Sequence, residues 1–247
     1  MLAADAFRDQ PVLHGRLVRL EPLTDAVLSA YLSALEDSEV SRLTGTHATF
    51  EPDAVRAWLQ TRQDHHDRAD WAIRRVQDDS FLGEAVINDL DPDNECANYR
   101  IWLAGPDAFG HGYGTETTQL VVEYALDQVG LHRLSLEVFD HNPRARRVYE
   151  KCGFVVEGRL RDALLWQGSW HDSLVMSIVQ TDSRPGGTTL PEALPADSAE
   201  QYDCEDSDGE VGSDVHQLAD DDPAGAVADD SQAEAPRRGR ALPPRPD

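Results

Sequence analysis

The chain has 247 residues and a formal net charge of −24, with 46 acidic against 22 basic side chains. This excess of negative charge argues against a nucleic-acid partner, because contacts to phosphate groups supply much of that affinity, and it suits cationic substrates. The three cysteines, Cys96, Cys152 and Cys204, lie far apart and the histidines are scattered, so we expect neither a disulfide framework nor a metal. Because no long apolar run is present, we expect no signal peptide and no membrane contact, and a cytoplasmic location.

Charge and composition divide the chain near residue 180. Residues 181–247 carry about half of the net charge, contain no tryptophan and are rich in Asp, Glu, Ala, Pro, Gly and Ser. Such a segment cannot bury enough apolar surface to offset its ordering entropy. We therefore predict a single domain over residues 13–180 and a disordered, acidic, proline-rich tail over 181–247. The basic end of the tail fits a peptide ligand for an unknown protein, a contact with a polyanion, or a solvated end without a dedicated partner.

The first half of the predicted domain contains strands joined by short turns. Residues 15–20 alternate apolar and basic side chains, which predicts a strand. Two helices follow, over 25–35 and 52–65, where apolar side chains recur at the spacing of one helix face. Three further strands are predicted over 70–76, 81–90 and 97–103. Because the turns between these strands are short, we expect an antiparallel meander.

After the meander, helices and strands alternate. A glycine-rich loop over 105–114 opens a helix that runs to about residue 128. The elements predicted after it are a strand over 133–139, a helix over 143–151, and strands over 154–161 and 174–179. A meander followed by such an alternation predicts a mixed α/β sheet flanked by helices.

The glycine-rich loop is the first candidate site. Gly110, Gly112 and Gly114 allow backbone amides to crowd together without Cβ atoms, and the start of a helix adds partial positive charge. This arrangement suits phosphate oxygens. The loop lacks the Gly-Lys-Ser/Thr of a P-loop, and its spacing differs from the GxGxxG of dinucleotide-binding folds. The glycines alone leave a plain strand-to-helix turn as the alternative.

Three segments in this order resemble the signature blocks of the GNAT superfamily of N-acetyltransferases. They are FGHGYGTE over 109–116, LHRLSLEV over 131–138 and NPRARRVYEKCGF over 142–154, within a similar region of about 13–179. The resemblance implies the GNAT fold, in which parallel central strands splay apart at the cofactor site. It also implies acetyl-CoA as cosubstrate, without a metal. Phe109 departs from the family pattern, which usually has Gln or Arg at this position.

The resemblance further implies which residues hold the cofactor. A bulged strand before the loop, carrying Trp102, Leu103 and Ala104, would line the cleft that holds the pantetheine arm and the thioester. Asn142 would bond the same arm, and it is also a natural N-cap before Pro143, so both roles are compatible. The amides expected to hold the pyrophosphate are those of Gly110, His111, Gly112, Tyr113, Gly114 and Thr115.

Acetyl transfer to an amine requires a neutral nucleophile, stabilisation of an oxyanion and a proton for the departing thiolate. By resemblance, Tyr149 is the tyrosine that protonates coenzyme A, with a core aromatic as the alternative. Related enzymes often place a basic glutamate on the central strands, where this chain has Asn98. Our candidate base is Glu84, and a solvated strand residue is its alternative reading.

The acceptor is inferred from pKa values and from resemblance. Deprotonating a lysine amine at pH 7 costs about 4 to 5 kcal/mol, whereas a peptide α-amine costs about 1 to 1.5 kcal/mol, which favours an α-amine for an enzyme without a strong base. Residues 154–161 and the pattern of Trp166, Trp170 and Met176 resemble the RimJ/RimL-like branch of ribosomal-protein N-terminal acetyltransferases. We expect acetylation of a protein or peptide N-terminus. The alternatives are acetylation of a small amine, such as spermidine or an aminoglycoside, and a non-catalytic acyl-CoA-binding regulatory module; a homodimer is left open.

Overall fold

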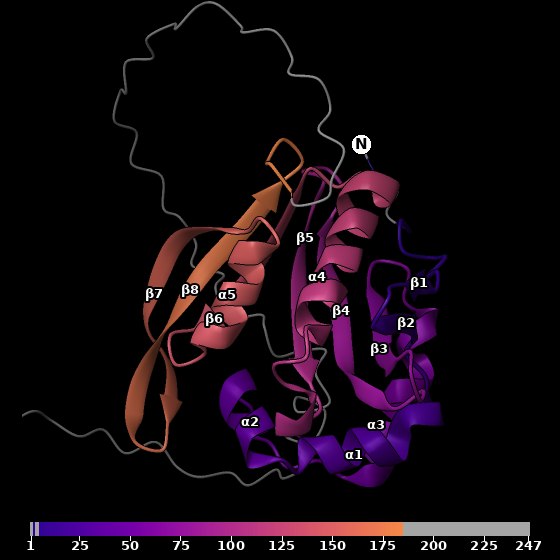
Figure 1. Ribbon diagram of the computed structural model, residues 1–247, viewed down its shortest axis with the longest axis vertical. Helices are drawn as coiled ribbons and strands as arrows, with labels where there is room; N and C mark the ends of the chain where they lie inside the picture. Colours follow the sequence, from indigo (N-terminus) through magenta and orange to yellow (C-terminus); the bar gives the residue numbers. More distant parts are fainter. Residues whose placement is uncertain (1, 3–4, 185–247) are drawn as a thin grey trace, which may run out of the picture.

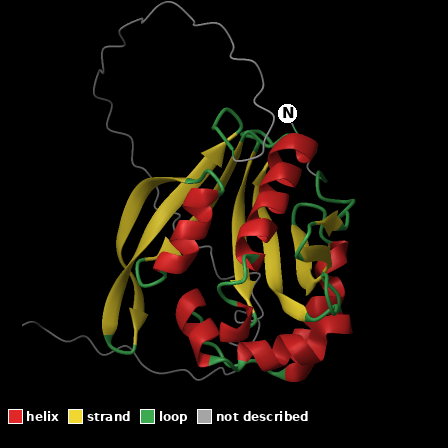
Figure 2. Cartoon of the chain, in the orientation of Figure 1, coloured by secondary structure: helices red, strands yellow, loops and turns green. Residues whose placement is uncertain are grey.

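A mixed eight-stranded sheet, with the strand order β1-β2-β3-β4-β5-β6-β8-β7, carries helices on its faces (Figures 1 and 2). The coordinates come from a computed structural model that describes residue 2 and residues 5–184. The predicted mixed α/β sheet is confirmed. Most of the tail predicted over 181–247 lies outside the described residues.

The first five strands form the antiparallel meander that the short turns predicted. Each strand pairs with the next one along the chain, and β4 and β5 are joined by the tight turn around residues 91–95. Their bounds are β1 (Leu13–His14), β2 (Val18–Pro22), β3 (Ala69–Arg75), β4 (Phe81–Asp91) and β5 (Cys96–Leu103).

Three α-helices lie between β2 and β3, where the sequence predicted two. The additional helix is α2 (Ser38–Thr44), which Asp37 caps by accepting hydrogen bonds from the amides of Glu39 and Val40, and which ends at Gly45 with φ 70°. An Asp N-cap and a following glycine are recognisable helix signals. The other two are α1 (Leu28–Leu35), preceded by a 3-10 turn (Asp25–Val27), and α3 (Pro52–Thr61), followed by a 3-10 turn (Arg62–Asp64).

The second half of the domain follows the predicted alternation, with two strands longer than expected. A register shift between Leu160 and Leu164, with φ 53° at Asp162, interrupts the alternation of β7, which hides its second half from a periodicity argument. The elements are α4 (Tyr113–Glu123), continued by a π-helical turn (Tyr124–Val129), then β6 (Arg133–Phe139), α5 (Pro143–Lys151), β7 (Val155–Trp166) and β8 (Ser169–Val179).

The central strands β5 and β6 are parallel and splay apart. They pair through three residues only, Cys96 to Asn98 on β5 with Arg133 to Ser135 on β6. Beyond this seam, β5 pairs with β4 and β6 pairs with β8. The bulge expected in β5 is wrong, because its pairing with β4 is regular from Leu103 to Asn98, and the register shift lies at the opposite end of the pair.

Two groups of apolar side chains cover the two faces of the sheet. One includes Trp71, Tyr99, Leu134 and residues of α4, and it is the larger. The other contains Tyr31 and residues of α1 and α3 packed on Ala72. Within the described part of the chain, no helix has both the length and the apolar character needed to cross a bilayer.

A chain ending at Arg184 is expected to keep the thermal stability of the full-length protein, whereas a chain ending at Gln180 should melt about 2 to 4 °C lower. The longer version retains Asp182, which accepts from the Val179 amide, and Arg184, which donates two hydrogen bonds to Asp127. Together they are worth about 1 kcal/mol. Melting curves of the three proteins test this. Equal melting of both truncated chains below the full-length protein would mean that residues after 184 stabilise the domain.

Candidate active site

The splay between β5 and β6 opens into a cleft of about 860 Å³. The loop before α4, the first turn of α4 and the length of α5 contribute to the lining of this cleft. Parts of α1 and α2 and the segment 43–50 contribute to it as well. The cleft brings together most of the residues that the sequence singled out, and its lining includes both candidate catalytic residues, Glu84 and Tyr149.

The glycine-rich loop presents unoccupied backbone donors to the cleft. Gly110 and Gly112 have φ values of 80° and 87°, a left-handed conformation that favours glycine. Gly112 caps α4 without a side-chain hydrogen bond. None of the amides from Gly110 to Thr115 donates a hydrogen bond within the described part of the chain. The loop therefore fits the pyrophosphate that the sequence predicted for it.

The acidic residue in the first turn of α4 does not compete for these amides. The carboxylate of Glu116 points away from the loop and accepts hydrogen bonds from the amides of Arg16, Leu17 and Val18, at 3.0, 2.6 and 2.8 Å. It thus fastens the turn before β2 to the helix. The start of α4 keeps its positive potential for an anion.

Helix α5 adds basic side chains that the sequence reasoning missed. Arg144, Arg147 and Lys151 line the cleft, and the guanidinium carbon of Arg144 lies 4.0 Å from the centroid of the Phe109 ring. Phe109, which departs from the family pattern, therefore supports a cation at the mouth of the cleft. The recurrence of basic residues in the segment 144–151 was the available signal.

Asn142 occupies the N-cap of α5, where its Oδ1 accepts from the Ala145 amide at 3.1 Å. The side chain also borders the cleft, so its amide nitrogen stays available as a donor. The N-cap role is confirmed, and the cofactor role stays a prediction.

The end of β5 supplies backbone groups on the open side of the sheet. The Ala104 amide donates to the Leu82 carbonyl at 2.8 Å. Because hydrogen bonding alternates along an antiparallel ladder, the amides of Ile101 and Leu103 face the gap instead. Trp102 and Leu103 line the cleft, whereas Ala104 and the exposed His111 lie outside its lining.

Tyr149 lies on α5 with its side chain largely buried, packed against the rings of Tyr99 and Phe154 at centroid distances of 6.5 and 5.9 Å. Its hydroxyl makes no hydrogen bond with any described residue. Burial, and secondarily Cys152, raise the pKa of the Tyr149 phenol well above its ordinary value. The residue therefore keeps its proton at neutral pH and has a donor free for a ligand in the cleft.

Glu84 is buried in the wall of the cleft, 2% exposed, and is not the solvated strand residue of the alternative reading. Its Oε2 accepts from the Trp102 indole at 2.7 Å and from the Tyr31 hydroxyl at 3.0 Å. Its Oε1 is buried without a hydrogen-bond partner among the described residues. Burial, reinforced by Asp70, raises the pKa of Glu84 to about 7, although Arg100 and the two hydrogen bonds oppose the shift. This value suits a general base at neutral pH.

Residues 17–155 match the acetyltransferase (GNAT) domain family. The chain belongs to the GNAT acetyltransferases. This match covers more than half of the chain and confirms the resemblance seen in the sequence. GNAT acetyltransferases use acetyl-CoA, which supplies the activated acetyl group as a thioester.

Several curated proteins resemble this GNAT chain. The uncharacterized N-acetyltransferase YoaA of Bacillus subtilis is 25% identical, over 69% of this chain and 97% of its own. A spermidine N(1)-acetyltransferase of Vibrio cholerae is 29% identical over 47% of this chain and 67% of its own. The putative ribosomal N-acetyltransferase YdaF of B. subtilis is 30% identical over 43% of this chain and 58% of its own.

A solved structure of a spermidine N-acetyltransferase from V. cholerae, in complex with CoA and spermine, shares the GNAT fold. It covers 67% of this chain and 97% of its own, with a TM-score of 0.61 and 20% sequence identity. At this identity the likeness concerns the fold alone.

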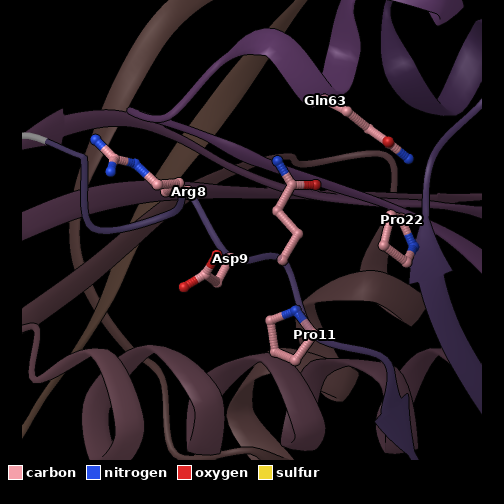
Figure 3. Close-up of a pocket in the computed structure, with 6 residues that line it drawn as sticks. Arg8, Asp9, Pro11, Pro22 and Gln63 are labelled. Carbon is pink, nitrogen blue, oxygen red and sulfur yellow. The ribbon is translucent and has the colours of Figure 1, made fainter.

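A second pocket, of about 400 Å³, lies beside the N-terminal segment of the GNAT domain (Figure 3). Its described lining contains no residue of the glycine-rich loop or of the splayed strands. It is lined by Arg8, Asp9, Gln10, Pro11, Pro22 and Gln63. The cleft at the splay is therefore the candidate active site.

Proposed function

We propose that this GNAT protein transfers the acetyl group of acetyl-CoA to the α-amine of a protein or peptide N-terminus. The observation that carries the proposal is Glu84, a residue of the cleft lining whose buried Oε1 has no hydrogen-bond partner among the described residues and whose pKa is about 7. An α-amine with a pKa near 8 gives up its proton to such a base at a cost of about 1 to 1.5 kcal/mol, whereas an amine near 10.4 costs about 4 to 5 kcal/mol.

In the proposed reaction the protein positions groups and moves two protons. Glu84 takes a proton from the acceptor ammonium, so that the neutral nitrogen forms a bond to the acetyl carbon while the carbon–sulfur bond breaks. Tyr149 donates a hydrogen bond, and then its proton, to the departing sulfur. The acetylated nitrogen still carries one proton more than the amide product, and it releases this proton through water to Tyr149, which restores the phenol. Since a thiol has a pKa of about 8.5, below that of a phenol, the hydrogen bond stabilises the developing charge before the proton transfers. The free amides of 110–115 and the basic side chains of α5 hold the phosphates.

Acetylation of spermidine is the second candidate, and the similarity to the V. cholerae spermidine N(1)-acetyltransferase favours it. Glu137 gives this candidate a second carboxylate on the wall of the cleft, hydrogen-bonded to Ser173 at 2.9 Å. The ring cluster of Tyr31, Trp58 and Trp102 beside Glu84 accepts a cation in either case.

Acetyl-CoA turnover with a panel of acceptors tests the proposal. The panel contains peptides with free N-termini, the same peptides with blocked N-termini and one lysine, spermidine and an aminoglycoside. We expect turnover with free N-termini and little with blocked peptides. A higher kcat/KM for spermidine would support the second candidate. Tight coenzyme A binding without turnover of any amine would contradict both.

Tyr149→Phe is expected to lower kcat by roughly 10- to 100-fold, because the departing sulfur loses its proton donor, while the dissociation constant of acetyl-CoA stays nearly unchanged. Steady-state kinetics and calorimetry measure the two quantities. Tyr124→Phe is a matched control, since Tyr124 is also buried but its hydroxyl bonds to the Asp9 carbonyl outside the cleft. Equal losses of kcat and of affinity in Tyr149→Phe would make Tyr149 a packing residue.

A further inference from the structure

Two histidines and an aspartate meet at the end of the sheet, although they lie thirty residues apart in the chain. Asp140 and His141 directly follow β6, and His171 lies near the start of β8. The His171 Nδ1 is 3.3 Å from the Asp140 Oδ1, and the His141 Nδ1 is 3.8 Å from the same oxygen. One ligand atom from each residue lies within 4.8 Å of the others.

The tautomer of His141 is fixed by its surroundings. Its Nε2 lies 2.9 Å from the Arg42 carbonyl oxygen. Because a carbonyl only accepts hydrogen bonds, Nε2 carries the hydrogen and the Nδ1 of the neutral ring has a free lone pair. A backbone carbonyl that accepts from the distal nitrogen is the usual support of a metal-binding histidine.

The Nδ1 of His141 is a buried polar atom. It has no hydrogen-bond partner among the described residues, and the side chain is 11% exposed. Phe139 stacks on the ring, with centroids 5.6 Å apart and planes 6° from parallel, so the ring has little freedom to turn. A buried nitrogen without a partner is costly. A hydrogen bond between His171 and Asp140 explains the position of His171, but it does not explain why the His141 Nδ1 is buried without a partner.

The distances fit a small metal ion with nitrogen and oxygen ligands. Zn²⁺ binds such ligands at about 2.0 to 2.2 Å, so that tetrahedral ligands lie about 3.3 to 3.5 Å from one another. The 3.3 Å between the His171 Nδ1 and the Asp140 Oδ1 already matches this spacing. The 3.8 Å from the His141 Nδ1 to the same oxygen is larger, and because the ligand atoms all lie within 4.8 Å of one another, a contraction of at most about 1.5 Å is required. Two imidazoles with one carboxylate favour Zn²⁺ and similar transition metals over Ca²⁺ or Mg²⁺, which prefer oxygen ligands.

We propose that Asp140, His141 and His171 form a binding site for Zn²⁺ or a related transition-metal ion. The side chains of Asp140 and His171 are 37% and 26% exposed, so the ion has access from solvent and water completes its coordination. Nearby Asp172 is not a ligand, because it accepts from Arg159 and from the Asp162 amide. The ion would tie the turn before α5 to β8 and, through the Arg42 carbonyl, to α2. Scattered histidines predict no metal from the sequence, and only the antiparallel pairing of β6 with β8 brings His141 and His171 together.

A cobalt titration of the full-length, chelator-treated protein tests the site. Co²⁺ in a tetrahedral site with nitrogen ligands absorbs visible light strongly, whereas Co²⁺ held in six-coordinate sites by surface carboxylates absorbs weakly. We expect about one equivalent of strongly absorbing Co²⁺ that Zn²⁺ displaces. His141→Gln and His171→Gln should each weaken binding at least tenfold. Glutamine at 141 keeps a donor for the Arg42 carbonyl, which protects the fold.

His132→Gln is the matched control, because His132 is an exposed histidine before the opposite end of β6. It should titrate like the unchanged protein. Zn²⁺ should also raise the melting temperature of the unchanged protein and of His132→Gln, but of neither ligand variant. Identical titrations of all four proteins, or weak absorption alone, would overturn the proposal.

Discussion

Glu84→Gln is expected to lower kcat by roughly 10²- to 10⁴-fold, because the acceptor ammonium loses the group that takes its proton. The unchanged protein should show kcat/KM rising with pH through about 7, the pKa of Glu84, because the base must be ionised to act. The variant should lack this limb of the pH profile. Affinity for acetyl-CoA should change little.

The same substitution is expected to stabilise the fold at pH 8. The folded state raises the pKa of Glu84 from 4.5 to about 7, so this carboxyl binds its proton more tightly in the folded state. Below about pH 4.5 the Glu84 carboxyl is protonated in both the folded and the unfolded state, and the protein keeps its full stability. As the pH rises to about 7, the unfolded state ionises first, and roughly 3 kcal/mol of stability disappears. Glutamine carries no such penalty and can still accept from Trp102 and Tyr31.

Urea unfolding at pH 4.5 and pH 8 measures this effect. The gain in the free energy of unfolding should be about 1 to 3 kcal/mol at pH 8 and should shrink at pH 4.5. Glu137→Gln is the control, since Glu137 is an exposed carboxylate in the same cleft. It should change neither the pH profile nor stability in this way. A Glu84→Gln variant that keeps the limb near pH 7 would exclude Glu84 as the base.

Gly112→Val is expected to weaken coenzyme A binding at least tenfold. Gly112 has φ 87° at the N-cap of α4, and a β-branched residue in this conformation costs about 1 to 3 kcal/mol. The added Cβ would lie 3.4 Å from the Leu17 Cδ1, an ordinary van der Waals contact, so the positive φ rather than crowding is expected to shift the backbone. Such a shift turns the free amides of 110–115 away from the position in which they would bind the pyrophosphate.

Gly168→Val separates this effect from a general loss of stability. Gly168 has φ 83° in the turn between β7 and β8, and a Cβ there meets nothing within 4 Å. Both variants should lose stability, but only Gly112→Val should lose coenzyme A affinity in a calorimetric titration. Unchanged affinity in Gly112→Val would contradict the role of the loop.

The sequence predicts those features that depend on local pattern. The meander follows from short turns, and the loop at 110–115 follows from closely spaced glycines next to a helix start. The second half of β7 escapes prediction because a bulge at Asp162 breaks its alternation. Helix α2 is short, and its cap signals were the only ones available.

The environment of single side chains is the part that sequence could not supply. Glu84 looks like any carboxyl in a strand, and its pKa depends on burial by α1 and β5, which are distant in sequence. The stacking of Arg144 on Phe109 also depends on the fold, because it brings α5 against the glycine-rich loop. The proximity of His141 to His171 requires the antiparallel pairing of β6 with β8.

Because β5 and β6 pair over a short seam, ligand binding in the cleft is expected to be coupled to local opening of that seam. Three residue pairs join the sheet half that contains β1 to β5 to the half that contains β6, β8 and β7. With so few rungs, the hydrogen bonds of the seam can open at a lower free energy than global unfolding requires, while the larger core, which contains Tyr99 and Leu134, keeps the halves together. A ligand that bonds to the Ile101 and Leu103 amides replaces missing rungs. These two amides should therefore exchange with deuterium quickly in the free protein and slowly in the complex.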